Sequence, residues 1–104
     1  MSDVIDEKRV LMIVDDESAQ RQLLGTYFRG LGFETVEAES AEEMLEQLHQ
    51  SVPDMILLDV RLPGMTGIEA LPEIRSRHIE VPVVLITAYA DLRQAVAAVK
   101  SGAD

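Results

Sequence analysis

The sequence predicts an α/β protein built on a doubly wound parallel sheet. Apolar runs of strand length alternate with segments of helical periodicity, and the unit repeats four times along the 104 residues. Repeated strand–helix alternation is typical of parallel strands joined by right-handed crossovers. Three of the runs show no polar alternation, which indicates strands that helices cover on both faces. The length fits a single domain.

The first strand and helix are expected within residues 10–31. Val10–Val14 is a continuous apolar run that stops at the acidic residues 15–17. From Ser18 onward the apolar residues recur every three or four positions, which predicts a helix. Its expected inner face consists of Ala19, Leu23, Leu24, Tyr27, Phe28 and Leu31. Gly32 follows and suits the position just after a helix.

The second strand, residues 33–38, is more polar than the others and is therefore expected at an edge of the sheet. Ser40 then begins a helix, with Glu43 three residues later in a capping-box pattern. The buried stripe of that helix is expected to be Met44, Leu45 and Leu48.

The third and fourth strands are residues 55–58 and Val83–Ile86, both wholly apolar. Residues 68–77 between them are predicted to be helical. Pro72 lacks the N–H that would bond to residue 68, so we expect either a kink or a late helix start. A last helix is expected from Asp91 to Gly102, with an inner face of Leu92, Ala95, Val96 and Val99.

The amino-acid composition excludes several kinds of partner and site. Nine lysines and arginines stand against 19 acidic residues, a formal charge of −10, so most of the surface would repel nucleic acid and anionic membranes. There is no cysteine, which excludes disulfides, thiol catalysis and cysteine zinc sites. No apolar run approaches the roughly 20 residues that span a bilayer, and the N-terminus lacks a signal-peptide pattern. We therefore expect a cytoplasmic protein with no membrane or nucleic-acid partner of its own.

Polar residues stand where the buried strands end. Asp15 and Asp16 follow the first strand, Asp59 follows the third and Thr87 follows the fourth. In doubly wound folds the ligand site lies outside the carboxyl ends of the strands. If these strands are neighbours, three carboxylates and a hydroxyl converge on one acidic pocket. Each residue alone is more simply a turn or cap, and Asp15 or Asp16 would suit the start of the next helix; the combination favours a site.

Clustered carboxylates repel one another and raise each other's pKa. A divalent cation removes this penalty, and a few carboxylates completed by water and substrate oxygens suit Mg²⁺. Such a site beside a spare carboxylate fits phosphoryl transfer, with the carboxylate as nucleophile. Thr87 is placed to donate a hydrogen bond to a phosphoryl oxygen, and Ala88 beside it leaves room for one.

The pattern resembles the receiver domain of bacterial two-component response regulators. Four segments match in order and spacing: VLMIVDDE (10–17), PDMILLDVRLPGMTG (53–67), PVVLITAYAD (82–91) and AVAAVKSGAD (95–104). Residues 1–8 would then be a flexible lead, and residues 9–104 a receiver domain that is incomplete at its C-terminus. The resemblance implies a flavodoxin-like receiver fold with strand order 2-1-3-4-5. Residues 87–104 are similar to receivers of nitrogen-regulation-type transcription activators.

The resemblance also implies roles. Asp59 would accept a phosphoryl group from the phosphohistidine of a sensor histidine kinase. Asp15, Asp16, Asp59 and the backbone carbonyl of Arg61 would hold Mg²⁺. Thr87 would be the switch hydroxyl, and Arg61 and Tyr89 occupy positions at which the family varies its dephosphorylation rate. The domain would be no enzyme beyond its own phosphorylation and dephosphorylation, and would control an effector domain in a longer chain.

The family's lysine, on a fifth strand, is absent from this chain, which shows four βα units and lacks the fifth. Lys100 falls within the predicted last helix and does not replace it. We expect slower phosphorylation and weaker stabilisation of the active conformation as a result. We also expect Val83–Ile86 to be an exposed apolar edge that favours self-association.

Two alternatives remain open. A pseudo-receiver would use the fold as a protein-binding module without phosphorylation, which the intact aspartates and Thr87 disfavour. An aspartyl-phosphate hydrolase of the haloacid dehalogenase type would have an acid two residues after its nucleophile, where this chain has Arg61.

Overall fold

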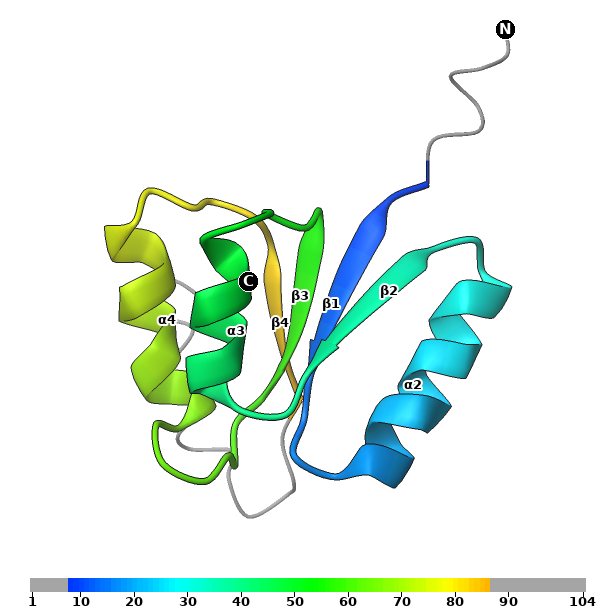
Figure 1. The fold of residues 1–104 in the computed structure, drawn as a ribbon, viewed down its shortest axis with the longest axis horizontal. Helices are drawn as coiled ribbons and strands as arrows, with labels where there is room; N and C mark the ends of the chain where they lie inside the picture. Colours follow the sequence, from blue (N-terminus) through cyan, green and yellow to red (C-terminus); the bar gives the residue numbers. More distant parts are fainter. Residues whose placement is uncertain (1–7, 87–104) are drawn as a thin grey trace, which may run out of the picture.

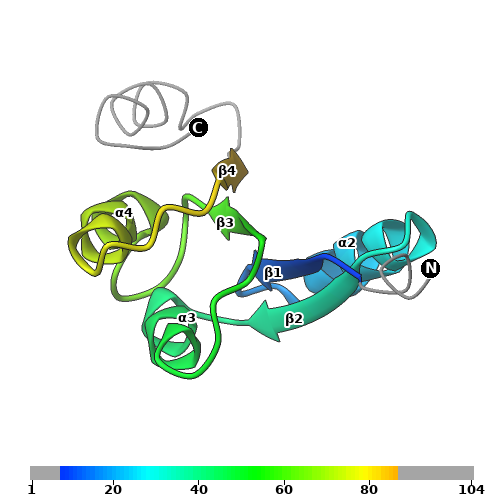
Figure 2. The ribbon, with the colours of Figure 1, turned by 90° about the horizontal axis from the view of Figure 1, so that it is seen from above.

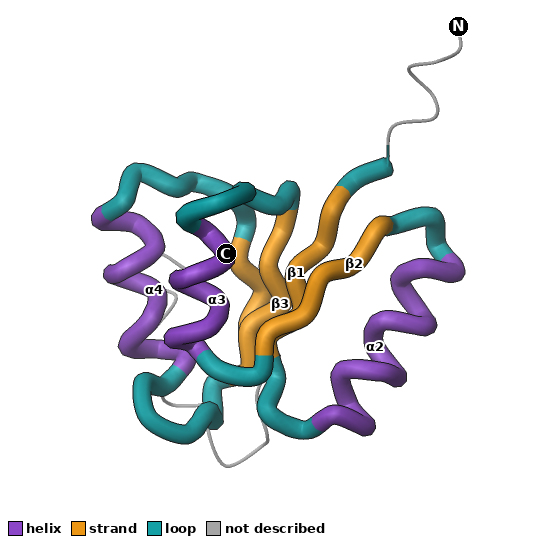
Figure 3. The backbone as a smooth tube through the Cα atoms, viewed as in Figure 1, coloured by secondary structure: helices purple, strands orange, loops and turns teal. Residues whose placement is uncertain are grey.

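The computed structural model describes residues 8–86, which form one four-stranded parallel sheet with three helices. The strand order is β2-β1-β3-β4, as the family resemblance implied. Figure 1 shows the elements in place and Figure 3 shows the strands and helices by type. The strands are β1 (Val10–Val14), β2 (Glu34–Ala38), β3 (Met55–Asp59) and β4 (Val83–Ile86). The helices are α2 (Ser18–Gly30), α3 (Ala41–Leu48) and α4 (Gly67–Ser76).

The helices lie on both faces of the sheet, with α3 and α4 on one side and α2 on the other (Figure 2). Alternate residues of β1 supply the two cores. Met12 and Val14 belong to the larger core with α3 and α4, whereas Leu11 and Ile13 face α2. All four are essentially inaccessible to solvent, because a strand between two helical layers has no polar face. This confirms the α/β doubly wound prediction.

The start of α3 and the end of α2 are set by the residues beside them. Ser40 caps α3 by accepting a hydrogen bond from the Glu43 amide, while the Glu43 carboxylate accepts from the Glu39 amide. The predicted cap is therefore present, although the return bond is made to Glu39 and not to Ser40. At the end of α2, Gly32 adopts a left-handed φ of +100°, as expected for the residue after a helix.

Of the two outcomes expected from Pro72, a kink or a late helix start, the late start is wrong. The helix begins at Gly67 and continues through Pro72. Thr66 and Glu69 form a reciprocal capping box that fixes the first turn. These two hydrogen bonds satisfy the backbone amides of Thr66 and Glu69. They fix the start of the helix at Gly67, before the proline.

The predicted inner face of α2 is wrong in part. Leu24 and Phe28 pack against Leu11, Ile13 and Leu57. Ala19 is exposed, and Leu23, Tyr27 and Leu31 are 68%, 62% and 59% exposed. The last three form a row of their own at a spacing of four, one position from the row that meets the sheet. Within residues 8–86 no second helix lies on this side of the sheet, so the outer row stays uncovered (Figure 2).

Burial of β4 on both faces is also wrong for the described part of the chain. Val83 is fully buried toward α3 and α4, but Val84 on the opposite side is 41% exposed. The strand is an edge of the described sheet, as expected for Val83–Ile86. The predicted helix 91–102 lies outside the described residues, as does most of the predicted lead. Among residues 8–86, no helix combines the length and apolar character needed to cross a bilayer.

Candidate functional site

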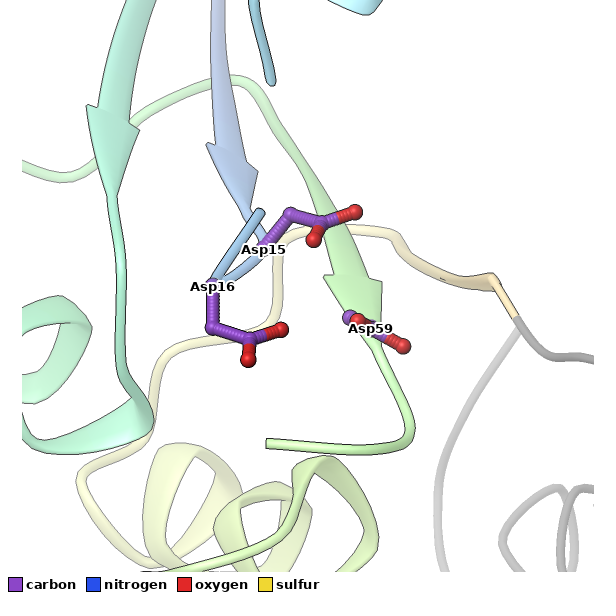
Figure 4. A group of neighbouring side chains, drawn as sticks. All are labelled: Asp15, Asp16 and Asp59. Carbon is purple, nitrogen blue, oxygen red and sulfur yellow. The ribbon is translucent and has the colours of Figure 1, made fainter. Parts of the chain in front are cut away.

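Three carboxylates meet at the carboxyl ends of β1 and β3 (Figure 4). Val14 pairs with Leu58 in the sheet, so the residues that follow them, Asp15 and Asp59, emerge side by side. One oxygen from each of Asp15, Asp16 and Asp59 lies within 4.8 Å of the others. Asp15 is buried, Asp16 exposed and Asp59 partly buried. The predicted convergence of these residues is confirmed.

Three hydrogen bonds hold Asp15 in the loop between β1 and α2, residues 15–17. The Asp15 amide donates to the carbonyl of Ala38 at 3.1 Å. An Asp15 carboxylate oxygen accepts from the Glu17 amide at 2.9 Å. Arg21 donates to the Asp15 carbonyl at 2.6 Å. Neither aspartate is the N-cap of α2; that residue is Glu17, which makes no side-chain cap hydrogen bond. Helix capping therefore does not account for these two carboxylates, although Asp15 does close the turn before α2.

Arg21 is a site residue that the sequence analysis missed. Besides Asp15, its guanidinium pairs with Glu37 at 3.2 Å, so one side chain on α2 links the ends of β1 and β2. Its position in the first turn after the acidic run was the only available signal. Arginine is suited to this task since its planar fork donates in two directions at once.

The loop between β3 and α4, residues 60–66, depends on a glycine where it meets the helix. Asp59 accepts a hydrogen bond from the Arg61 amide at 3.0 Å, which orients its carboxylate. The Gly67 amide returns to the Val60 carbonyl at 3.1 Å. A Cβ atom at Gly67 would lie 2.2 Å from the Asp59 carbonyl oxygen. Only glycine therefore allows α4 to begin this close to the end of β3.

The electrostatics of the pocket disfavour a charged Asp59. Desolvation by burial is the main cause that raises its pKa to about 6, and the charges of Asp15, Asp16 and Glu17 add to the rise. The Arg61 amide opposes it. A cation among the three carboxylates would reverse this penalty. An all-oxygen donor set with carboxylates of differing exposure fits Mg²⁺, which keeps several water ligands.

Four other predicted positions lie outside the described residues. These are Thr87, Ala88, Tyr89 and Lys100. Ile86, the last described residue, pairs with Asp59 in the sheet, so β4 runs beside β3 as expected. The role of the Arg61 carbonyl as a metal ligand stays a prediction.

Residues 11–104 match the response regulator receiver domain family. The chain belongs to this family. The receiver domain is 44% identical over 93 residues to the regulatory protein AtoC of Escherichia coli, covering 89% of this chain and 20% of AtoC. It is 39% identical over 97 residues to the DNA-binding transcriptional regulator NtrC of Klebsiella pneumoniae, covering 93% and 21%. The receiver domain thus spans about a fifth of the length of these relatives.

Solved receiver structures share the fold. The Francisella response regulator 1452 receiver domain superposes with a TM-score of 0.86 at 27% identity, covering 93% of this chain and 80% of that one. The receiver domain of NtrX from Brucella abortus gives 0.84 at 34% identity, covering 89% and 79%. The receiver fold is confirmed, and transcriptional regulators are among the curated relatives of the chain.

Proposed function

We propose that this receiver domain accepts a phosphoryl group on Asp59 from the phosphohistidine of a sensor histidine kinase. One observation carries the proposal: in a chain of the receiver family, Asp59 stands at a strand end with its oxygen within 4.8 Å of those of Asp15 and Asp16. The Asp15 and Asp59 carboxylates each close a turn by accepting a backbone hydrogen bond, but neither bond requires three carboxylates to converge. Together they form a cation site around a nucleophile.

Asp15, Asp16, Asp59 and the carbonyl of Arg61 would hold Mg²⁺. When bound, the ion neutralises the phosphoryl oxygens and the carboxylates around them. Asp15 is suited to a fixed ligand because it is buried and held at both its amide and its carbonyl. Asp16 is exposed, so the site is open to solvent and to the phosphoryl donor on the side of this residue.

In the transfer step a carboxylate oxygen of Asp59 forms a bond to phosphorus as the bond from phosphorus to the donor's imidazole nitrogen breaks. The imidazole keeps the electron pair of that bond and leaves as neutral imidazole, because its other ring nitrogen carries a proton. The Arg61 amide holds the Asp59 carboxylate in one orientation during attack. Hydrolysis then adds water to phosphorus, releasing inorganic phosphate and restoring the carboxylate. The domain turns over nothing besides its own phosphoryl group.

Thr87 would supply the hydroxyl that moves toward the phosphoryl group and switches the conformation. The output would belong to an effector outside these residues, because the curated relatives are about five times as long. NtrC is described as a DNA-binding transcriptional regulator, and transcription regulation is the output we propose. DNA binding would then be a property of the effector, as expected for a domain of charge −10.

The test is intact mass spectrometry after incubation with Mg²⁺ and acetyl phosphate, with Asp59→Asn alongside. We expect one phosphoryl adduct on the parent, dependent on Mg²⁺ and lost in hydroxylamine, and none on Asp59→Asn. An adduct on both proteins would place the acceptor elsewhere. Rapid turnover of unrelated phosphate esters would favour the hydrolase.

The same phosphorylation experiment is repeated on a longer chain that includes the family's lysine on the fifth strand. An adduct on that chain alone would assign the missing reactivity to the lysine and keep Asp59 as the acceptor. No adduct on either chain would contradict the proposal and favour the pseudo-receiver.

A further inference from the structure

The loop that follows the acceptor strand is tied to α3 by one side chain. The Met65 amide donates a hydrogen bond to a carboxylate oxygen of Glu42 at 3.1 Å, across 23 positions of sequence. Glu42 lies in the first turn of α3, and Met65 lies between Asp59 and the start of α4. The bond therefore joins two elements that neither the sheet register nor a helix cap connects.

The local backbone is shaped around this carboxylate. Gly64 has a left-handed φ of +73°. A Cβ atom there would lie 2.9 Å from the bonded oxygen of Glu42, so a side chain would displace the carboxylate or the loop. Glycine at this position thus allows both the turn and the close approach.

The two ends of the loop are fixed by other contacts. The Arg61 amide bonds to the Asp59 carboxylate, and the Gly67 amide bonds to the Val60 carbonyl. Thr66 is held by its capping box with Glu69. Residues 63–65 lie between these points, with Pro63 and Gly64 exposed. Glu42 supplies the hydrogen bond that fixes this outer part.

We propose that Glu42 is a positioning residue for the phosphoacceptor site. Its carboxylate fixes the Met65 amide and so restrains residues 63–65, the outer part of the loop that also carries the Arg61 carbonyl. The inference rests on the proposed function, since it assumes that Arg61 contributes a ligand there. A looser loop would have to be ordered when the cation binds, and that ordering weakens binding.

Glu42 could influence the cation through its charge alone, and three variants separate the two effects. Glu42→Gln keeps an acceptor oxygen at the same reach but removes the charge. Glu42→Asp keeps the charge but shortens the side chain by one carbon. Glu42→Ala removes both. Glu46→Ala is the matched control, since Glu46 is exposed one turn further along the same helix.

The first readout is hydrogen exchange of the Met65 amide in the metal-free protein. We expect exchange on the order of three- to tenfold faster in Glu42→Ala and Glu42→Asp, the effect of losing one hydrogen bond of ordinary strength. Glu42→Gln and Glu46→Ala should match the parent. Amides of β1 and β3 report whether any variant has lost stability as a whole.

The second readout is Mg²⁺ affinity by titration. The Kd should rise about three- to tenfold in Glu42→Ala and Glu42→Asp and stay near the parent value in Glu42→Gln. Weak binding by Glu42→Gln equal to that of Glu42→Ala would overturn the inference, since charge would then be the cause. Unchanged exchange at Met65 in every variant would also overturn it.

Phosphorylation distinguishes failure of this inference from failure of the proposed function. If the parent accepts no phosphoryl group on Asp59, the proposed function fails, whereas the Met65 exchange data still decide whether Glu42 orders the loop. If the parent is phosphorylated and all Glu42 variants bind Mg²⁺ equally, only the positioning role fails.

Discussion

Replacing Asp59 with asparagine should stabilise the metal-free domain at pH 8. The native carboxylate is partly buried beside Asp15 and Asp16, and this environment raises its pKa from 3.8 to about 6. Asparagine keeps the shape and an acceptor oxygen for the Arg61 amide but carries no charge. The substitution therefore removes a desolvation penalty, and a smaller repulsion from the neighbouring carboxylates, that the folded state carries and the unfolded chain does not.

The size of the effect follows from the pKa. Each unit of difference corresponds to about 1.4 kcal/mol, so a rise from 3.8 to about 6 sets an upper limit of about 3 kcal/mol. Asp59 is only partly buried, and the solvent that reaches it reduces both the desolvation penalty and the repulsion. We expect Asp59→Asn to increase the free energy of unfolding by about 1–2 kcal/mol at pH 8.

The pH dependence gives the sign. Because the folded state raises the pKa, the Asp59 charge is destabilising and its full penalty applies above pH 6. As the pH falls from about 6 toward 3.8, the folded protein takes up a proton that the unfolded chain does not, and the penalty disappears. The advantage of Asp59→Asn should therefore be greatest at pH 7 and above and should shrink as the pH falls below about 6.

Urea unfolding in the presence of a chelator, at pH 5, 6, 7 and 8, measures this difference. Asp54→Asn is the matched control, because Asp54 lies just before β3 at the other end of the sheet and accepts a hydrogen bond from the Val10 amide at 2.7 Å. That control should be neutral or destabilising. A stability difference for Asp59→Asn that is the same at all four pH values, or a less stable variant at pH 8, would refute the electrostatic argument.

Three further predictions concern the loop and the sheet edge. Gly67→Ala should lower the free energy of unfolding by about 1–3 kcal/mol in urea titrations, because its Cβ would lie 2.2 Å from the Asp59 carbonyl oxygen; native stability would contradict the proposed close approach. Thr66→Ala should cost about 1 kcal/mol through loss of the capping box, and an unchanged urea midpoint would show the cap to be dispensable. The domain should self-associate through β4 at high concentration, and Val84→Lys should suppress this in sedimentation experiments; a parent that stays monomeric would argue against pairing at this edge.

Strand positions were predictable from the sequence because an uninterrupted apolar run has few other uses in a chain of this size. The same reasoning placed Asp15, Asp16 and Asp59 together, since parallel strands end at one edge of the sheet. Periodicity was less informative for α2. It identified a helix, but Leu23 and Tyr27 continue the apolar pattern without touching the described sheet. A repeat of three and four residues does not say which part of the helix surface a neighbour covers.

The contacts that shape the site were mostly beyond sequence reasoning. Arg21 and Glu42 act through hydrogen bonds to backbone atoms 6 and 23 residues away, and a side chain's reach across a fold leaves no local pattern. The start of α4 was a different case. Thr66 and Glu69 carry a capping-box pattern that fixes this start, and the first turn forms ahead of Pro72.

The most direct test of the central claim is to identify the residue that carries the phosphoryl group. Borohydride reduces an acyl phosphate to an alcohol, so a phosphorylated aspartate becomes homoserine and is located by peptide sequencing in the mass spectrometer. After treatment with Mg²⁺ and acetyl phosphate, we expect homoserine at Asp59 and at neither Asp15 nor Asp16. Homoserine at Asp15 or Asp16, with Asp59 unmodified, would contradict the assignment of acceptor and metal ligands.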